Sequence, residues 1–68
     1  MRYAVVIEKG QTSYGAYVPD LPGCVAVGET LEETKQLIKE AIAFHLEGLQ
    51  EDSSPIPESI SICEYVEV

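Results

Sequence analysis

Few side chains in this 68-residue chain could do covalent chemistry. Cys24 is a candidate nucleophile, but a reactive thiol needs a base beside it and a lowered pKa. The single histidine, His45, is the only candidate base, and it recurs with apolar residues at helical spacing. Because free cysteines are commonly buried, we predict that Cys24 is a small core residue and that His45 packs where a helix meets a sheet.

A metal site is also not expected. Zinc sites take three or four ligands, and one histidine without a CxxC pair does not supply them. Two cysteines are likewise too few for a disulfide framework. We therefore predict no metal, no cofactor and no catalytic residue.

The charge balance restricts the partners. Twelve acidic residues against four basic ones give a net charge of −8. Nucleic acids and anionic membranes are bound by clustered Lys and Arg, so the balance argues against both and favours a basic protein. Acidity that serves only solubility is the alternative. The chain starts without a signal-peptide pattern and has no membrane-spanning run, so we expect a cytoplasmic protein with reduced thiols.

Hydrophobic periodicity predicts the elements that must position these residues. Strands are expected in residues 2–10, 14–19, 24–29 and 60–68, and a helix in residues 30–50. Thr30 and Glu33 form a capping box at the start of the helix. Gly48 either caps the end of the helix or lies inside its last turn.

The order β-β-β-α-β predicts an α+β fold, a two-layer sandwich of one sheet and one helix. A strand–helix–strand crossover is almost always right-handed. Placing the last strand beside the first and parallel to it gives the sheet order 3-2-1-4. In the last strand Ile60, Ile62, Val66 and Val68 share a face, which Glu64 interrupts as a bulge or an inward charge that guards an edge.

Self-association is expected from the thin core of so short a chain. The first strand is apolar on both faces, with Tyr3, Val5 and Ile7 on one side and Ala4 and Val6 on the other. One helix covers only one face of the sheet. A second copy of the chain is the simplest cover for the other face.

The loop before the third strand, "PDLPGC", has turn chemistry and an exposed acid. Pro22 suits the second turn position and Gly23 the third, while Asp20 can accept a hydrogen bond from its own turn. Leu21 and Pro22 beside this acid would present an apolar tip to a basic partner. The predicted partner-binding residues are Asp20, Leu21, Pro22, Gly23 and Cys24.

These motifs resemble the HicB antitoxin family. The resemblance rests on "PDLPGC", on "GET" at residues 28–30, on "EA" and "HLE" within residues 40–47, and on "PIPE" at residues 55–58. It covers essentially the whole chain. It implies a truncated ribonuclease H-like fold and a partner, a small basic HicA-like toxin that cleaves mRNA and whose active site the antitoxin occludes.

The resemblance leaves alternatives open. Many members carry a C-terminal DNA-binding domain, whereas we expect a single domain over residues 1–68, without direct nucleic-acid binding. A stand-alone oligomeric domain with a structural or regulatory role and no toxin is the second hypothesis. A nuclease is the third, but Ala4, Val5 and Val6 stand where the first metal-binding acid would lie, and Glu8 is near the strand end. We predict that the chain is not an enzyme.

Overall fold

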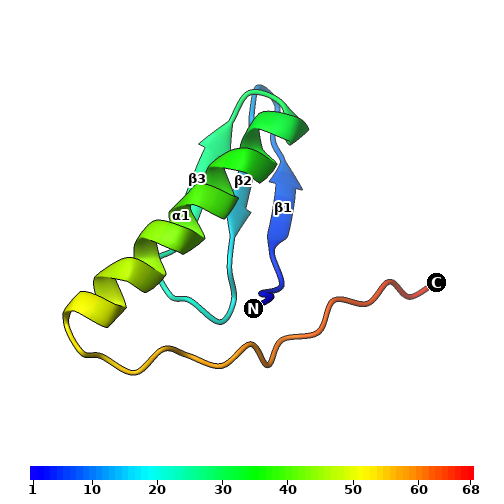
Figure 1. Ribbon diagram of the computed structural model, residues 1–68. Coiled ribbons are helices and arrows are strands. Elements are labelled where there is room, and N and C mark those ends of the chain that lie inside the picture. Colours follow the sequence, from blue (N-terminus) through cyan, green and yellow to red (C-terminus); the bar gives the residue numbers. More distant parts are fainter.

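The computed structural model describes all residues from Met1 to Val68. Three short antiparallel strands are followed by one long helix (Figure 1): β1 (Val6–Lys9), β2 (Tyr14–Tyr17), β3 (Val25–Gly28) and α1 (Leu31–Glu51). The sheet order is β1-β2-β3. The helix lies across one face of this sheet and extends beyond it (Figure 1). The predicted α+β class and the three-stranded antiparallel part of the sheet are confirmed.

The strand register separates an inner from an outer face of the sheet. Ile7 lies opposite Ala16 in the β1–β2 pair, and Ala16 lies opposite Ala26 in the β2–β3 pair. Directly opposed residues share a face, so this row points toward α1 and packs in the core. The neighbouring row, which includes Tyr17 and Val25, points away from α1, and Val25 is 62% exposed.

The start of α1 is fixed by the predicted capping box. The Thr30 hydroxyl accepts from the amide of Glu33 at 3.1 Å, and the Glu33 carboxylate accepts from the amide of Glu29 at 2.7 Å. The first bond satisfies a backbone donor of the first helical turn, whereas the Glu33 carboxylate binds the amide one residue before Thr30 and not that of Thr30 itself. At the other end Asp52 is the C-cap, so Gly48 lies inside the helix.

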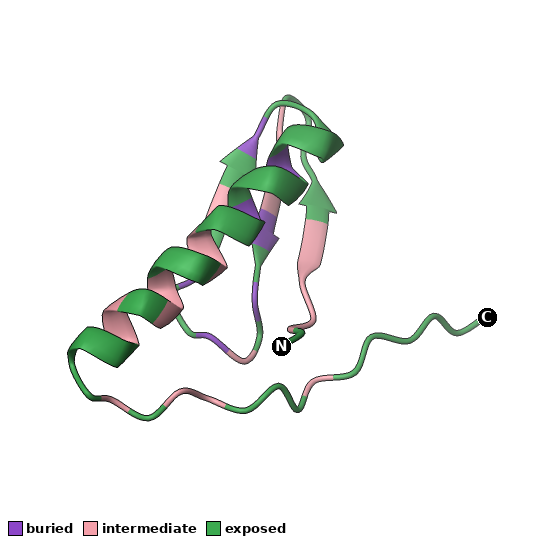
Figure 2. Cartoon of the chain, viewed as in Figure 1, coloured by how far each residue is buried: buried purple, intermediate pink, exposed green.

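The core is small. Five apolar side chains are buried: Ala16, Val18, Leu21, Cys24 and Ile38. In Figure 2 the buried residues lie on β2, in the loop between β2 and β3, at the end of β3 and in the first half of α1, and the rest of the chain is half-buried or exposed. No helix has the length and apolar composition needed to cross a bilayer.

The expected fourth strand is not formed within the single chain. Residues 60–68, here called the C-terminal arm, are extended but are assigned to no strand. Most arm residues are exposed, and the arm runs from beneath the start of β1 away from the sheet (Figure 1). The expectation that this segment pairs with β1 of its own chain is therefore wrong here, and the sheet has three strands. The ribonuclease H-like relation stays a prediction.

The close approach of β3 to the start of α1 yields a stability test. A Cβ atom at Gly28 would lie 2.5 Å from Thr34 Oγ1 and 3.0 Å from the Thr34 backbone nitrogen. Because the backbone cannot swing away like a flexible side chain, G28A should lower the free energy of unfolding by about 1–3 kcal/mol. Urea denaturation measures this loss.

Gly15 is the matched control for that substitution, because a Cβ there would meet nothing within 4 Å. G15A should leave the unfolding midpoint nearly unchanged. Equal effects of G28A and G15A would contradict the tight packing of β3 against α1.

Candidate partner-binding surface

The loop from Asp20 to Cys24 is a tight turn of the predicted kind. The amide of Cys24 donates to the carbonyl of Leu21 at 3.0 Å, with Pro22 and Gly23 at the two central positions. Gly23 has φ +84°, a conformation that suits glycine at the third turn position. A further bond from the amide of Val18 to the carbonyl of Cys24 closes the loop at 3.2 Å. The predicted turn is confirmed.

Burial corrects the expected role of Leu21. Its side chain is completely buried in the core, so it does not form an exposed apolar tip. The prolines on both sides suggested a surface loop, but the turn folds Leu21 inward beneath the sheet end. Pro22 and Gly23 are exposed and remain the surface part of the loop. Whether this loop binds a partner stays a prediction.

Cys24 is buried, as predicted for a core residue. Its burial raises the pKa of the thiol, which disfavours the reactive thiolate. His45 is half-buried and lines the same hollow as Cys24, so the structure does bring the two residues to one place. The raised thiol pKa argues against a nucleophile there. No group of three or more His, Cys, Asp or Glu side chains is arranged to hold a metal ion.

Asp20 has a distant role that the sequence did not indicate. Its carboxylate accepts from the amides of Ile60 at 3.1 Å and Ser61 at 3.0 Å, and from the Ser61 hydroxyl at 2.8 Å. The expectation that Asp20 bonds to its own turn is therefore wrong. The Ser61 amide and hydroxyl, with a smaller contribution from the Ile60 amide, lower the pKa of Asp20 against the opposing effect of burial.

A hollow of about 460 Å³ lies between this loop and the second half of α1. Its lining residues come from the turn, from the start of β3 and from the helix: Gly23, Cys24, Val25, Ala41, Phe44, His45, Gly48, Leu49 and Asp52. Phe44 is 79% exposed. No role was predicted for Phe44 from the sequence. Its position outside the apolar stripe of the helix could have indicated an exposed aromatic ring.

Acidic side chains surround Phe44 on the helix. Glu40 and Glu47 are its neighbours at four residues before and three residues after, and both are exposed. Glu33, Glu40 and Glu47 recur every seven residues, which places them on one side of α1, away from the buried Ile38. An exposed aromatic ring with an acidic border suits a basic protein that has an apolar pocket.

The chain is thus a small acidic α+β domain of three strands and one helix. Residues 3–68 match the family model described as the HicB-like antitoxin of bacterial toxin–antitoxin systems. The chain belongs to this family.

Relatives come from a phage, a bacterium and an archaeon. An uncharacterized 14.9 kDa protein of Haemophilus phage HP1 is 46% identical over 66 residues, which are 97% of this chain and 50% of the relative. A UPF0150 protein of Helicobacter pylori is 49% identical over 69% of this chain and 65% of its own length. A UPF0150 protein of Thermoplasma acidophilum is 41% identical over 84% of each chain. This chain therefore spans about half of the phage relative and about two thirds of the Helicobacter relative. No solved structure matches the chain.

The bonds of Asp20 predict a titration that can be read at the arm. Because the folded-state pKa of Asp20 is lowered, its stabilisation is complete above the ordinary value of about 3.9. It is lost as the pH falls through the lower folded value. In NMR spectra the amide shifts of Ile60 and Ser61 should therefore titrate with a midpoint below that ordinary value.

D20A should abolish this titration and move both amide shifts toward those of an unstructured chain. E58A, which removes an exposed carboxylate close in sequence to the arm, is the control and should leave the titration in place. Amide shifts that ignore D20A would show that Asp20 does not hold the arm.

Proposed function

We propose that this chain is an antitoxin domain that neutralises a small basic HicA-like toxin, an mRNA-cleaving enzyme, by covering its active site. The observation that carries the proposal is the family match over residues 3–68. Antitoxin family membership supports a role in binding rather than in catalysis. Occlusion needs a complementary surface and no reactive group on this chain.

The charge of the chain supports a basic partner. The net charge of −8 attracts a positively charged protein and speeds the first encounter. Such steering weakens with salt, because the Debye length is only about 8 Å at physiological ionic strength. Association with the toxin should therefore be faster at low salt.

We assign the toxin to the hollow beside Phe44. The exposed ring supplies an apolar anchor, and Glu40 and Glu47 flank it with negative charge. Gly23 and Cys24 of the predicted binding loop line one wall of the hollow, and the neighbouring Pro22 is exposed. Leu21 and Cys24 support that wall from the core, and Asp20 bonds to the arm behind it. A loop held this firmly loses little entropy on binding.

Self-association into a dimer or tetramer is the second part of the proposal. The outer face of the sheet exposes Tyr17, Val25 and Val27 at 42%, 62% and 66%. The single helix covers only the inner face (Figure 1). A second copy of the chain would remove these side chains from water.

A binding experiment tests the toxin assignment. The chain is co-expressed with the small basic protein encoded beside it, and the dissociation constant is measured at low and high salt. F44A should weaken binding by about tenfold or more, the usual scale for a buried aromatic anchor. E47K should weaken it as well, mainly at low salt, because a repulsive charge then faces the basic toxin.

E8K is the matched control, because it makes the same charge change on β1, far in sequence from the hollow. It should alter affinity much less than E47K. Equal losses for E8K and E47K would contradict the assigned surface. No association of the two unmodified chains at low salt would contradict the antitoxin role and favour a stand-alone oligomeric domain.

A further inference from the structure

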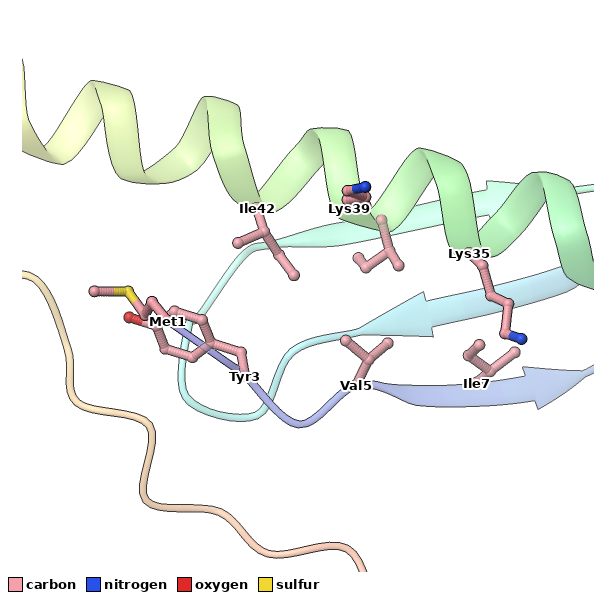
Figure 3. Close-up of a pocket in the computed structure, with 8 residues that line it drawn as sticks. Met1, Tyr3, Val5, Ile7, Lys35, Lys39 and Ile42 are labelled. Atoms are coloured by element: carbon pink, nitrogen blue, oxygen red, sulfur yellow. The ribbon is translucent and has the colours of Figure 1, made fainter.

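A second hollow lies on the opposite side of the molecule, between β1 and α1. It has a volume of about 440 Å³ and is mainly apolar, and we call it the β1 groove. Its lining residues come from the start of the chain and from the helix: Met1, Tyr3, Val5, Ile7, Lys35, Ile38, Lys39 and Ile42. Figure 3 shows Val5, which directly precedes β1, and Ile7 in β1 pointing toward α1, with Lys35 reaching across from the helix.

The edge of the sheet beside this groove is open. β1 pairs only with β2, so the backbone N–H and C=O groups on its other side have no strand partner. Such an edge accepts an added strand, and side chains from one face of that strand would enter the β1 groove. The groove is therefore shaped for an extended segment with alternating apolar residues.

The C-terminal arm has this pattern. Ile60, Ile62, Val66 and Val68 share one face, and the exposed fractions of Ile62 and Val66 are 82% and 81%. Seven residues from Ile62 to Val68 span about 20 Å when extended, about the length of the chain from Met1 to Ile7. The arm is long enough to cover the groove.

No residue of the arm lines the β1 groove of its own chain, although Ser61, Ile62 and Cys63 line a separate hollow together with Arg2, Tyr3 and Ala4. Asp20 fixes the backbone at Ile60 and Ser61, and from there the arm continues away from the sheet (Figure 1). To enter the groove of its own chain, the arm would have to bend back toward β1 within residues 62–68, because its end runs away from the sheet (Figure 1). The remaining sequence, ICEYVEV, has no Gly, Pro, Asn, Asp or Ser, the residues that favour turns. The β-branched residues favour a straight strand instead.

Charge identifies the kind of strand that the groove accepts. Lys35 and Lys39 line it, and they are two of only four basic residues in the chain. On the arm, Glu64 interrupts the apolar face between Ile62 and Val66, so it points the same way as they do. A paired arm would bring Glu64 toward these two lysines. This contact explains an acid that is otherwise out of place on an apolar face.

We propose that residues 62–68 of the arm pair with the β1 edge of a second copy of this chain. The arm of that second copy pairs in the same way with the β1 edge of the first. Glu64 of each arm then pairs with Lys35 and Lys39 of the other copy. The partner's arm fills the fourth position of the predicted sheet order 3-2-1-4. This inference rests on the self-association part of the proposed function and is independent of toxin binding.

The exchange leaves the surface assigned to the toxin free. The β1 groove is lined by the β1 side of the sheet, whereas the hollow with Phe44 is lined by β3 and the loop before it. The two surfaces share no lining residue. A dimer with exchanged arms could therefore carry a toxin on each copy.

A charge-swap experiment distinguishes exchange from pairing within one chain. One variant carries E64K and the other carries K35E with K39E, so each chain alone places like charges together. Both should dimerise at least tenfold more weakly than the unmodified chain in sedimentation equilibrium. Mixed, unfolded together and refolded, the two variants should form a heterodimer, because each arm then meets the opposite charge.

The outcomes separate the proposals. A monomeric unmodified chain would overturn both self-association and arm exchange. A dimer whose variants are not rescued by mixing, while one chain with all three substitutions is rescued, would show that the arm pairs within its own chain. Variants that dimerise as tightly as the unmodified chain would overturn the contact between Glu64 and the lysines. Circular dichroism of each variant confirms that it is folded.

Cross-linking of the unmodified sequence gives a second readout. Cys63 lies on the arm and is exposed, whereas Cys24 is buried. Natural and ¹⁵N-labelled chains are unfolded together, refolded and treated with a thiol–amine linker, with C63S as the control. Exchange predicts that roughly half of the links from Cys63 to Lys35 or Lys39 join chains of different isotope content, as in a statistical mixture of dimers. Links only within chains of one isotope content would overturn the exchange.

Discussion

The packing of one helix against one face of a small sheet is the constraint on which the rest of the structure depends. Three strands of four residues each receive a helix of 21 residues, and only five apolar side chains become buried. Much of the remaining apolar surface lies on the outer face of the sheet, at the edge of β1, around Phe44 on α1 and on the arm. A chain of this size and composition gains stability by covering such surface with other chains.

The same constraint separates the two surfaces that we propose for binding. On the β1 side the molecule has an open strand edge, an apolar groove and two lysines. On the β3 side it has a hollow with an exposed phenylalanine and acidic neighbours. In our proposals, the two lysines of the β1 groove receive the acidic arm of a second copy, and the hollow with acidic neighbours receives a basic toxin. Under these proposals, the positions of a few charges distinguish self-recognition from recognition of another protein.

Local features were predictable from the sequence, whereas distant contacts were not. The capping box at Thr30 and the turn at Pro22 and Gly23 depend on neighbouring residues, and both were predicted correctly. The bond from Asp20 to Ser61 joins residues 41 positions apart, and no spacing rule indicates it. Alternation in the arm predicted an extended strand, but a two-residue period carries no information about which chain supplies the partner edge. Leu21 was wrongly predicted to be exposed, because it lies between turn-forming residues and such a context gives no sign that the side chain is buried.

The most direct test of an incomplete single-chain core is the dependence of stability on protein concentration. Urea unfolding of the purified chain is followed by circular dichroism from low to high micromolar concentration. If a second copy completes the structure, mass action raises the unfolding midpoint as the concentration increases. An unchanged midpoint, together with a monomeric mass throughout that range, would contradict the claim that a second copy of the chain completes the core.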